Sequence, residues 1–214
     1  VMNIAASMAL KGSKVALVDL DLRKASLGKA LGLIHSGVAS YLNGKSTDYR
    51  PNLDEIQPGL FVLPIGTLPP NPTELLLSDN FKNMIDQMRQ EFDYIFLDCP
   101  PIDLVADSSI ITDVVDMSVF VMRAGLMDKR VLPVIEDLYK SKKYRHMTLI
   151  LNSVDIQYKK YADMIPDQIT LTIPKDKEYL SKPELFMLDL LSNYQWDRPI
   201  NLLSMGGDIN IGLK

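Results

Sequence analysis

The chain has 214 residues, of which 47% are hydrophobic and 23% are charged, so it can bury one substantial core, or a core with a small appendage. Its formal net charge of -4 and its pI near 5.2 exclude a broad basic surface, so composition gives no support for nucleic-acid binding. Its one cysteine excludes an internal disulfide.

The first two predicted elements are a buried helix and a buried strand. Residues 1–10 are mostly apolar or small and are followed by Lys11 and Gly12, which predicts a helix that ends at the glycine. Residues 14–18 form a short apolar run of β-prone residues. Because this run is unbroken rather than alternating, it indicates a strand that is covered on both faces, as in a parallel sheet.

Strands and helices then follow one another along the chain. Apolar runs of the same kind occupy residues 60–63, 94–97, 117–122 and 147–151. Between some of them, apolar residues recur at helical spacing after a Ser78–Asp79 cap and again after Asp128. These helical positions are Phe81, Met84, Ile85, Met88 and Phe92 in the first segment, and Val131, Val134, Ile135 and Leu138 in the second. The pattern predicts a doubly wound α/β fold with a mostly parallel sheet.

The character of the sequence changes after Asp155. Residues 157–163 are polar, whereas residues 169–173 alternate between apolar residues and threonine, which predicts a strand. A capping box at residues 181–184 predicts a further helix. We therefore place a boundary near residue 160, between a larger domain at residues 1–160 and a small C-terminal appendage at residues 161–214.

Acidic residues follow two of the predicted strands. In open α/β sheets the ligand lies at the carboxyl ends of the strands, and here Asp19, Asp21 and Arg23 follow one apolar run and Asp98 follows another. A carboxylate in this place beside a phosphate site can bind Mg²⁺ or one of its waters. The structural alternative for Asp98 is that it ends its strand before the two prolines at 100 and 101. The second acidic end shifts the balance toward a metal and phosphate site.

The two acidic strand ends resemble the Walker A′ and Walker B motifs of the bacterial tyrosine kinases of capsule and exopolysaccharide synthesis, which are P-loop proteins related to the ParA and MinD ATPases. The matching patterns are apolar-Asp-x-Asp-x-Arg at residues 18–23 and apolar-Asp-x-Pro-Pro at residues 97–101. The stretch Pro-Asn-Pro-x-Glu-Leu-Leu at residues 70–76 also matches this family and is not shared by MinD and ParA. The resemblance covers about the first 155 residues.

The resemblance implies roles for individual residues. Asp19 would deprotonate or position the hydroxyl group of the substrate tyrosine, and Asp21 and Asp98 would belong to the Mg²⁺ shell. Asn152 would contact the adenine of ATP, although it could equally cap a helix or turn. Arg23 could approach phosphates or a neighbouring subunit, or it could be a solvated surface charge. ATP and Mg²⁺ are the implied cofactors.

The phosphate-binding P-loop, G-x-x-x-x-G-K-S/T, does not occur in the chain. In the layout of the family it would end a few residues before Val1, because residues 1–7 resemble the helix that follows its lysine. The expected fold is therefore of P-loop NTPase type but lacks, at the N-terminus, the strand that leads into this loop and that is normally central in the sheet. We expect the chain by itself to be inactive as a kinase.

The C-terminal part carries two candidate phosphoacceptors. The family ends in a tyrosine-rich tail, and Tyr158 and Tyr161 lie at the corresponding place, although they could equally be ordinary surface tyrosines. Residues 179–200 instead resemble a soluble tail segment of large membrane glycosyltransferase-like proteins from Bacteroidetes, and no function is carried over from it. Three other residues receive no role: Cys99 is expected to be buried, and His35 and His146 lack partners at metal-ligand spacing.

The function implied by the resemblance is that of an ATP- and Mg²⁺-dependent protein-tyrosine kinase that autophosphorylates in trans within a ring-like homo-oligomer and regulates polysaccharide synthesis and export. Its implied partner is a membrane polysaccharide co-polymerase or adaptor region. The alternatives are a ParA- or MinD-like ATPase that switches assembly state, and a catalytically inactive scaffold subunit. No stretch approaches the ~20 apolar residues of a membrane span. The expected location is therefore cytoplasmic, at the inner face of the bacterial inner membrane, through a partner or a segment outside this sequence.

Overall fold

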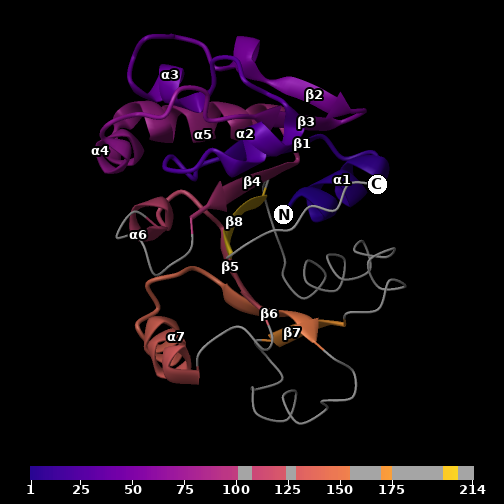
Figure 1. Cartoon of the computed structure of the whole chain (residues 1–214), viewed down its shortest axis with the longest axis vertical. Helices are drawn as coiled ribbons and strands as arrows, with labels where there is room; N and C mark the ends of the chain where they lie inside the picture. The colour runs from indigo at the N-terminus through magenta and orange to yellow at the C-terminus, as the bar shows by residue number, and fades with distance from the viewer. Residues whose placement is uncertain (101–107, 124–128, 155–169, 175–199, 207–214) are drawn as a thin grey trace.

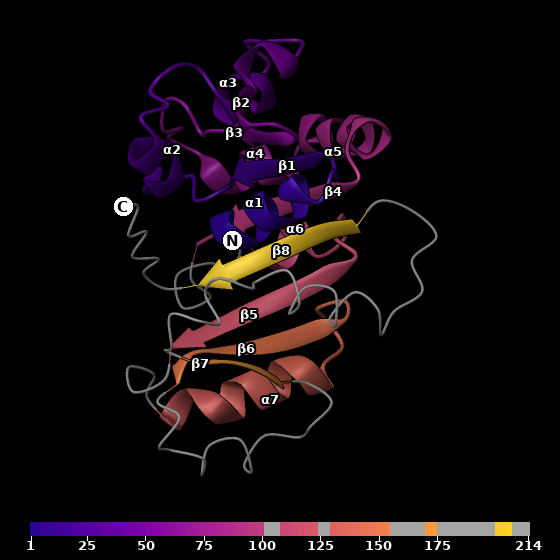
Figure 2. The same ribbon diagram turned by 90° about the vertical axis from the view of Figure 1, so that its right-hand side faces the viewer.

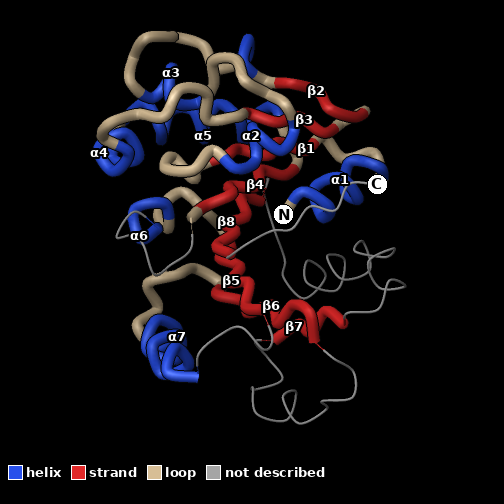
Figure 3. Tube along the Cα trace, viewed as in Figure 1, coloured by secondary structure: helices blue, strands red, loops and turns tan. Residues whose placement is uncertain are grey.

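The computed structural model describes residues 1–100, 108–123, 129–154, 170–174 and 200–206, which form one eight-stranded sheet flanked by helices (Figure 1). Figure 3 distinguishes the two kinds of element. In chain order they are α1 (Met2–Leu10), β1 (Val15–Asp19), α2 (Ser26–Leu31), α3 (Val38–Leu42), the 3-10 helix η1 (Arg50–Asn52), β2 (Asp54–Gln57), β3 (Leu60–Leu63), α4 (Pro72–Leu77), α5 (Asp79–Glu91), β4 (Tyr94–Cys99), α6 (Ser108–Ile111), β5 (Met117–Arg123), the 3-10 helix η3 (Lys129–Val131), α7 (Leu132–Lys140), β6 (Met147–Val154), β7 (Thr170–Pro174) and β8 (Ile200–Gly206).

The sheet has the strand order β2-β3-β1-β4-β8-β5-β6-β7. Figure 2 shows its central and lower strands side by side. Every neighbouring pair is parallel except β2 and β3, which form an antiparallel pair at one edge. The predicted class, a doubly wound and mostly parallel α/β sheet, is confirmed. Each of the five unbroken apolar runs became a parallel strand, because a strand that is covered on both faces needs apolar side chains on both.

Alternate residues of β1 face two different hydrophobic clusters. Val15 and Leu17 pack with α1 and α2 on one face of the sheet, whereas Ala16 and Val18 pack with residues of α3, α4 and α5 on the other. Figure 1 shows α1 on the opposite side of the sheet from α6 and α7. Because successive strand residues point to opposite faces, a strand that is apolar throughout can hold both layers together.

The helix predicted after Ser78 is α5, and its start is as expected. The hydroxyl oxygen of Ser78 accepts a hydrogen bond from the backbone N–H of Phe81 at 3.3 Å, which satisfies one of the free donors of the first turn. The second predicted helix is also present, as α7 directly after the short 3-10 helix η3. In α7 the side chain of Ile135 is buried but that of Val134 is 53% exposed, and the expected cap at Asp128 lies outside the described residues.

Two strands after residue 160 belong to the same sheet as the kinase-like motifs. The predicted strand near residues 169–173 is β7, which pairs with β6 at the edge. Strand β8, which the sequence analysis did not predict, lies in the interior between β4 and β5. The capping box at residues 181–184 lies outside the described residues. The division of the chain near residue 160 stays a prediction. Within the described part of the chain, no helix has the length and apolar character of a membrane span.

His35 lies in the loop after α2 and connects it to the edge strand β2. Its Nδ1 lies 2.6 Å from the carbonyl oxygen of Ser36, and its Nε2 lies 2.6 Å from a carboxylate oxygen of Asp54. Both partners can accept a hydrogen bond, so this geometry favours the charged imidazolium, in which both ring nitrogens donate. The hydrogen bond to Ser36 and then the contact with Asp54 raise the pKa of His35 above its usual 6.5.

We predict that this contact stabilises the fold only while His35 is protonated. Since the pKa is raised in the folded state, the contribution is complete below pH 6.5 and is lost as the pH rises through the folded-state pKa. An NMR titration of the His35 ring should give a pKa above 6.5, and Asp54→Asn should lower that value. Identical titration curves for the two proteins would contradict the contact.

Candidate active site

The carboxyl ends of β1 and β4 bring the predicted acidic residues together. The two strands are adjacent and parallel, and Asp19 pairs in register with Asp98. Directly after β1, the backbone N–H of Leu20 donates a hydrogen bond of 2.8 Å to the carbonyl oxygen of Asp98. Asp21 follows two residues after Asp19 and is also buried. The structure therefore places the three carboxyl groups at one edge of the sheet, as the sequence pattern predicted.

Asp19 is completely buried and is held by two backbone donors. Its Oδ1 accepts a hydrogen bond from the N–H of Asp21 at 3.2 Å, and its Oδ2 accepts one from the N–H of Gly28 at 3.4 Å. Gly28 was not among the site residues predicted from the sequence. A Cβ at this position would lie 3.2 Å from the carbonyl oxygen of Leu33 and 3.3 Å from the Cβ of Pro64, so a glycine allows helix α2 to approach this closely.

The carboxyl groups of Asp19 and Asp98 resist ionisation. Burial, followed by repulsion from Asp98, raises the pKa of Asp19 to about 7, against the stabilising effect of its two backbone donors. Burial raises the pKa of Asp98 to about 6, with a further rise from Asp21, although the nearby α-amino group of Val1 acts in the opposite direction. A cation at this edge would relieve both the repulsion and the loss of solvation.

Asp21 offers a free ligand atom in this acidic group. Its Oδ1 is buried and has no hydrogen-bond partner among the described residues. Within the same residues, no three acidic, histidine or cysteine side chains converge closely enough to enclose a metal ion by themselves. Mg²⁺ in nucleotide sites is normally bound by one or two carboxylates, with waters and phosphate oxygens completing the shell. The carboxylate oxygens of Asp21 and Asp98 fit such a Mg²⁺ site.

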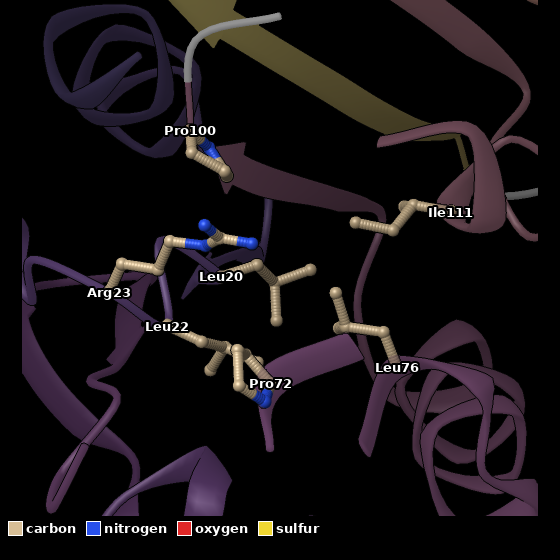
Figure 4. Close-up of a pocket in the computed structure, with 7 residues that line it drawn as sticks. All are labelled: Leu20, Leu22, Arg23, Pro72, Leu76, Pro100 and Ile111. Carbon is tan, nitrogen blue, oxygen red and sulfur yellow. The ribbon is translucent and has the colours of Figure 1, made fainter. Parts of the chain in front are cut away.

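Arg23 lies beside the end of β4. It helps to line a small, mainly apolar pocket whose other lining residues are Leu20, Leu22, Pro72, Leu76, Pro100 and Ile111. In Figure 4 the guanidinium group of Arg23 extends between Leu20 and Pro100. The side chain is exposed to solvent, and it lines this pocket together with Pro100, which follows Asp98 by two residues.

Asn152 lies farther along the same edge. It is in β6 and pairs in register with Arg123 of β5. Three strand spacings separate β4 from β6 in the sheet order, which corresponds to about 14 Å at the usual strand separation. Asn152 therefore does not contact the three carboxyl groups, but it lies at the distance from them that an extended nucleotide could span. Tyr158 and Tyr161 lie outside the described residues.

One Gly-Lys-Ser sequence occurs in the chain, at Gly44, Lys45 and Ser46, but its surroundings differ from those of a phosphate-binding loop. It follows helix α3, whereas such a loop follows a strand and leads into a helix. Lys45 is exposed, and its backbone N–H donates a hydrogen bond to the side chain of Asn43 at 3.1 Å. The geometry gives this segment no role at the acidic edge.

Comparison with known proteins identifies relatives that are named tyrosine-protein kinases. The chain is 36% identical over 165 residues to the tyrosine-protein kinase CpsD of Streptococcus pneumoniae serotype 4, which covers 75% of this chain and 71% of the relative. It is 34% identical over 151 residues to the tyrosine-protein kinase YwqD of Bacillus subtilis, which covers 70% of this chain and 64% of the relative.

Solved structures of kinase domains are also similar to this chain. The kinase domain of VpsO has a TM-score of 0.66 at 29% identity and covers 72% of this chain and 76% of that structure. The kinase domain of Escherichia coli tyrosine kinase ETK has a TM-score of 0.64 at 27% identity, covering 70% and 59%. The MinC:MinD cell division complex of Aquifex aeolicus matches with a TM-score of 0.62 at 21% identity, covering 88% and 81%, which shows the shared fold alone.

The C-terminal part has a different similarity. A family model described as TMEM260-associated domain 2 matches residues 146–213. This range begins just before β6 and includes β7 and β8. The interior strand β8 therefore comes from a part of the chain that matches a second family.

Proposed function

Because the chain belongs to the bacterial tyrosine-protein kinase family, we propose that its acidic edge is the metal-binding and proton-accepting part of an ATP-dependent protein-tyrosine kinase site. The observation that carries this proposal is the meeting of Asp19, Asp21 and Asp98 at the ends of two adjacent parallel strands. Phosphoryl transfer needs aligned reactants and compensation of negative charge more than covalent help from the protein. Carboxylates that bind Mg²⁺ next to a base meet both requirements.

Asp19 is the proposed base. A carboxyl group with a pKa near 7 can accept a proton at neutral pH, whereas an ordinary aspartate with a pKa of 3.8 is a much weaker base. The two backbone donors orient the carboxylate, so that its direction is fixed before a substrate arrives. Since Asp19 is completely buried in this structure, an incoming tyrosine hydroxyl reaches it only after the atoms that cover it move.

Asp21 and Asp98 are the proposed residues of the metal shell, directly or through water. Asp21 has the unpartnered Oδ1, and Asp98 is half-buried and therefore closer to solvent than Asp19. When bound, Mg²⁺ would neutralise charge on the phosphates. Arg23 adds a positive charge at the same edge, and Asn152 is the proposed contact of the adenine.

The proposal also covers the tyrosines that accept the phosphoryl group and the proteins that assemble with the kinase. Tyr158 and Tyr161 are the proposed phosphoacceptors, modified in trans by a neighbouring copy in a ring-like homo-oligomer. A membrane polysaccharide co-polymerase or adaptor region would hold this assembly at the cytoplasmic face of the inner membrane, where phosphorylation would regulate capsule or exopolysaccharide synthesis and export. The family resemblance supports these statements, and ATP and Mg²⁺ are the proposed cofactors.

Mass spectrometry after incubation with ATP and Mg²⁺ tests this function. The protein to use is the chain extended ahead of Val1 by a β-strand followed by G-x-x-x-x-G-K-S/T, because the 214 residues do not contain this motif. Phosphotyrosine is the expected product. Formation of ADP without phosphotyrosine would instead support an ATPase like MinD, whose fold the chain shares. Neither product would support an inactive scaffold subunit.

A further inference from the structure

Strand β8 is the last strand in the chain but lies in the interior of the sheet. It pairs in parallel with β4 from Tyr94 to Cys99, and on its other side with β5 from Met117 to Val121. The two neighbours do not pair with each other, so β8 is the element that joins the halves β2-β3-β1-β4 and β5-β6-β7 of the sheet.

The slot between β4 and β5 cannot remain empty. The flanking strands are apolar and buried, with Ile95, Phe96 and Leu97 on one side and Val119 and Phe120 on the other. Removal of β8 would leave their inward-facing N–H and C=O groups without hydrogen-bond partners, and such groups are costly when they are buried. A strand of some origin must therefore fill the slot in a folded molecule.

The same slot is where a phosphate-binding loop would have to be presented. Such a loop follows directly after a strand, and a strand next to β4 would bring its loop beside Asp98. One neighbour of β4 is β1, which already ends in Asp19, so only the slot is left. The helix after the loop must also begin nearby, and Val1, directly ahead of α1, packs against the hydrophobic cluster that includes Phe96 of β4 and Val119 of β5.

The position of β8 leaves no place in the slot for a strand that carries a phosphate-binding loop. Its register places Ser204 level with Asp98, so its carboxyl end reaches the same edge of the sheet as the acidic residues. We infer that β8 competes with a loop-bearing strand for the slot between β4 and β5, so that the chain with β8 in place is the state that excludes nucleotide. The exclusion of nucleotide rests on the proposed function, whereas the competition itself concerns only which strand fills the slot.

Hydrogen exchange measured by mass spectrometry tests the competition without any substitution. In the 214-residue chain, the amides of β8 are expected to be protected, because they lie between two strands. In the chain extended by a strand and G-x-x-x-x-G-K-S/T, the amides of β8 should exchange at least about tenfold faster, because the new strand displaces them. The amides of β1 should stay protected in both proteins. Equal protection of β8 in the two proteins would overturn the inference.

A disulfide between β4 and β8 gives a second readout. Tyr94 and Ile200 pair in register at the amino ends of these strands, away from the acidic edge. With Tyr94→Cys and Ile200→Cys, mild oxidation of the 214-residue chain should give a high yield of this disulfide. The matched control is Tyr94→Cys with Asn201→Cys, which should not cross-link because successive strand residues point to opposite faces. Cys99 is buried and should not interfere.

The disulfide yield separates this inference from the proposed function. The yield should fall by about tenfold in the extended chain, and addition of ATP and Mg²⁺ should lower it further. An unchanged yield on extension would overturn the competition, whether or not the protein binds nucleotide. A yield that falls on extension but does not respond to ATP would support the competition and count against the proposed nucleotide site.

Discussion

The 214-residue chain is expected to bind ATP at least about a hundredfold more weakly than the same chain extended by a strand and G-x-x-x-x-G-K-S/T. The acidic edge supplies three carboxyl groups, and the sequence contains no G-x-x-x-x-G-K-S/T loop whose lysine and amides could hold phosphates, so the repulsion of a triphosphate is poorly compensated. Strand β8 also fills the position next to β4 from which a loop would reach the phosphates. Calorimetry with ATP and Mg²⁺ measures the difference.

The control for this measurement is the extended chain with the loop lysine replaced by alanine. It keeps the added strand but loses the charge that holds the phosphates, so its ATP affinity should be close to that of the 214-residue chain. Micromolar affinity of the 214-residue chain itself would contradict the prediction. It would mean that other groups of this chain hold the triphosphate.

Asp19→Asn is expected to stabilise the fold at pH 8. The pKa of Asp19 rises from 3.8 to about 7 on folding, so the folded state retains a proton that the unfolded state has lost. Stability therefore falls as the pH rises from about 4 to about 7, by up to about 4 kcal/mol when the penalty is complete. The amide carries no charge, but its NH2 group cannot accept one of the two backbone hydrogen bonds that Asp19 accepts, and this loss costs about 1–2 kcal/mol. A net gain of about 2–3 kcal/mol should appear in denaturant unfolding at pH 8.

Two comparisons test the origin of this gain. Below about pH 4 the carboxyl group of Asp19 is protonated in both states, so the advantage of Asp19→Asn should disappear there. At pH 8, Asp116→Asn should have the opposite effect, because Asp116 is buried and its carboxylate lies 3.1 Å from the guanidinium of Arg89. A destabilising effect of Asp19→Asn at pH 8 would show that its carboxylate is favoured by the fold.

The parallel strands could be predicted from the sequence because a short unbroken apolar run is typical of a strand that is buried on both faces. Residues 14–18 and 94–97 became β1 and β4, and the capped periodic segment after Ser78 became α5. The edge strand β2 was missed because its residues are polar and pair on one side only. Val134 shares the helical spacing of Ile135 but is exposed, since helical spacing alone does not say how wide a face the sheet covers.

The interior place of β8 could not be predicted from local pattern. Residues 200–206 come after a long segment of different character, and only the tertiary requirement to fill a gap in the sheet selects their position. The acidic edge could be predicted, because the ends of parallel strands meet. What the sequence could not show is burial, and burial is the main reason that the pKa of Asp19 rises to about 7.

The most direct test of the proposed site compares Asp19→Asn and Asp98→Asn in the extended chain, with phosphotyrosine measured by mass spectrometry and ATP affinity by calorimetry. The account predicts that Asp19→Asn abolishes phosphotyrosine at every Mg²⁺ concentration while ATP still binds, because the amide keeps the shape but cannot accept a proton. Asp98→Asn should raise the Mg²⁺ concentration needed for activity, because it removes a charged ligand of the metal shell. Full phosphotyrosine formation by Asp19→Asn would contradict the assignment of the base.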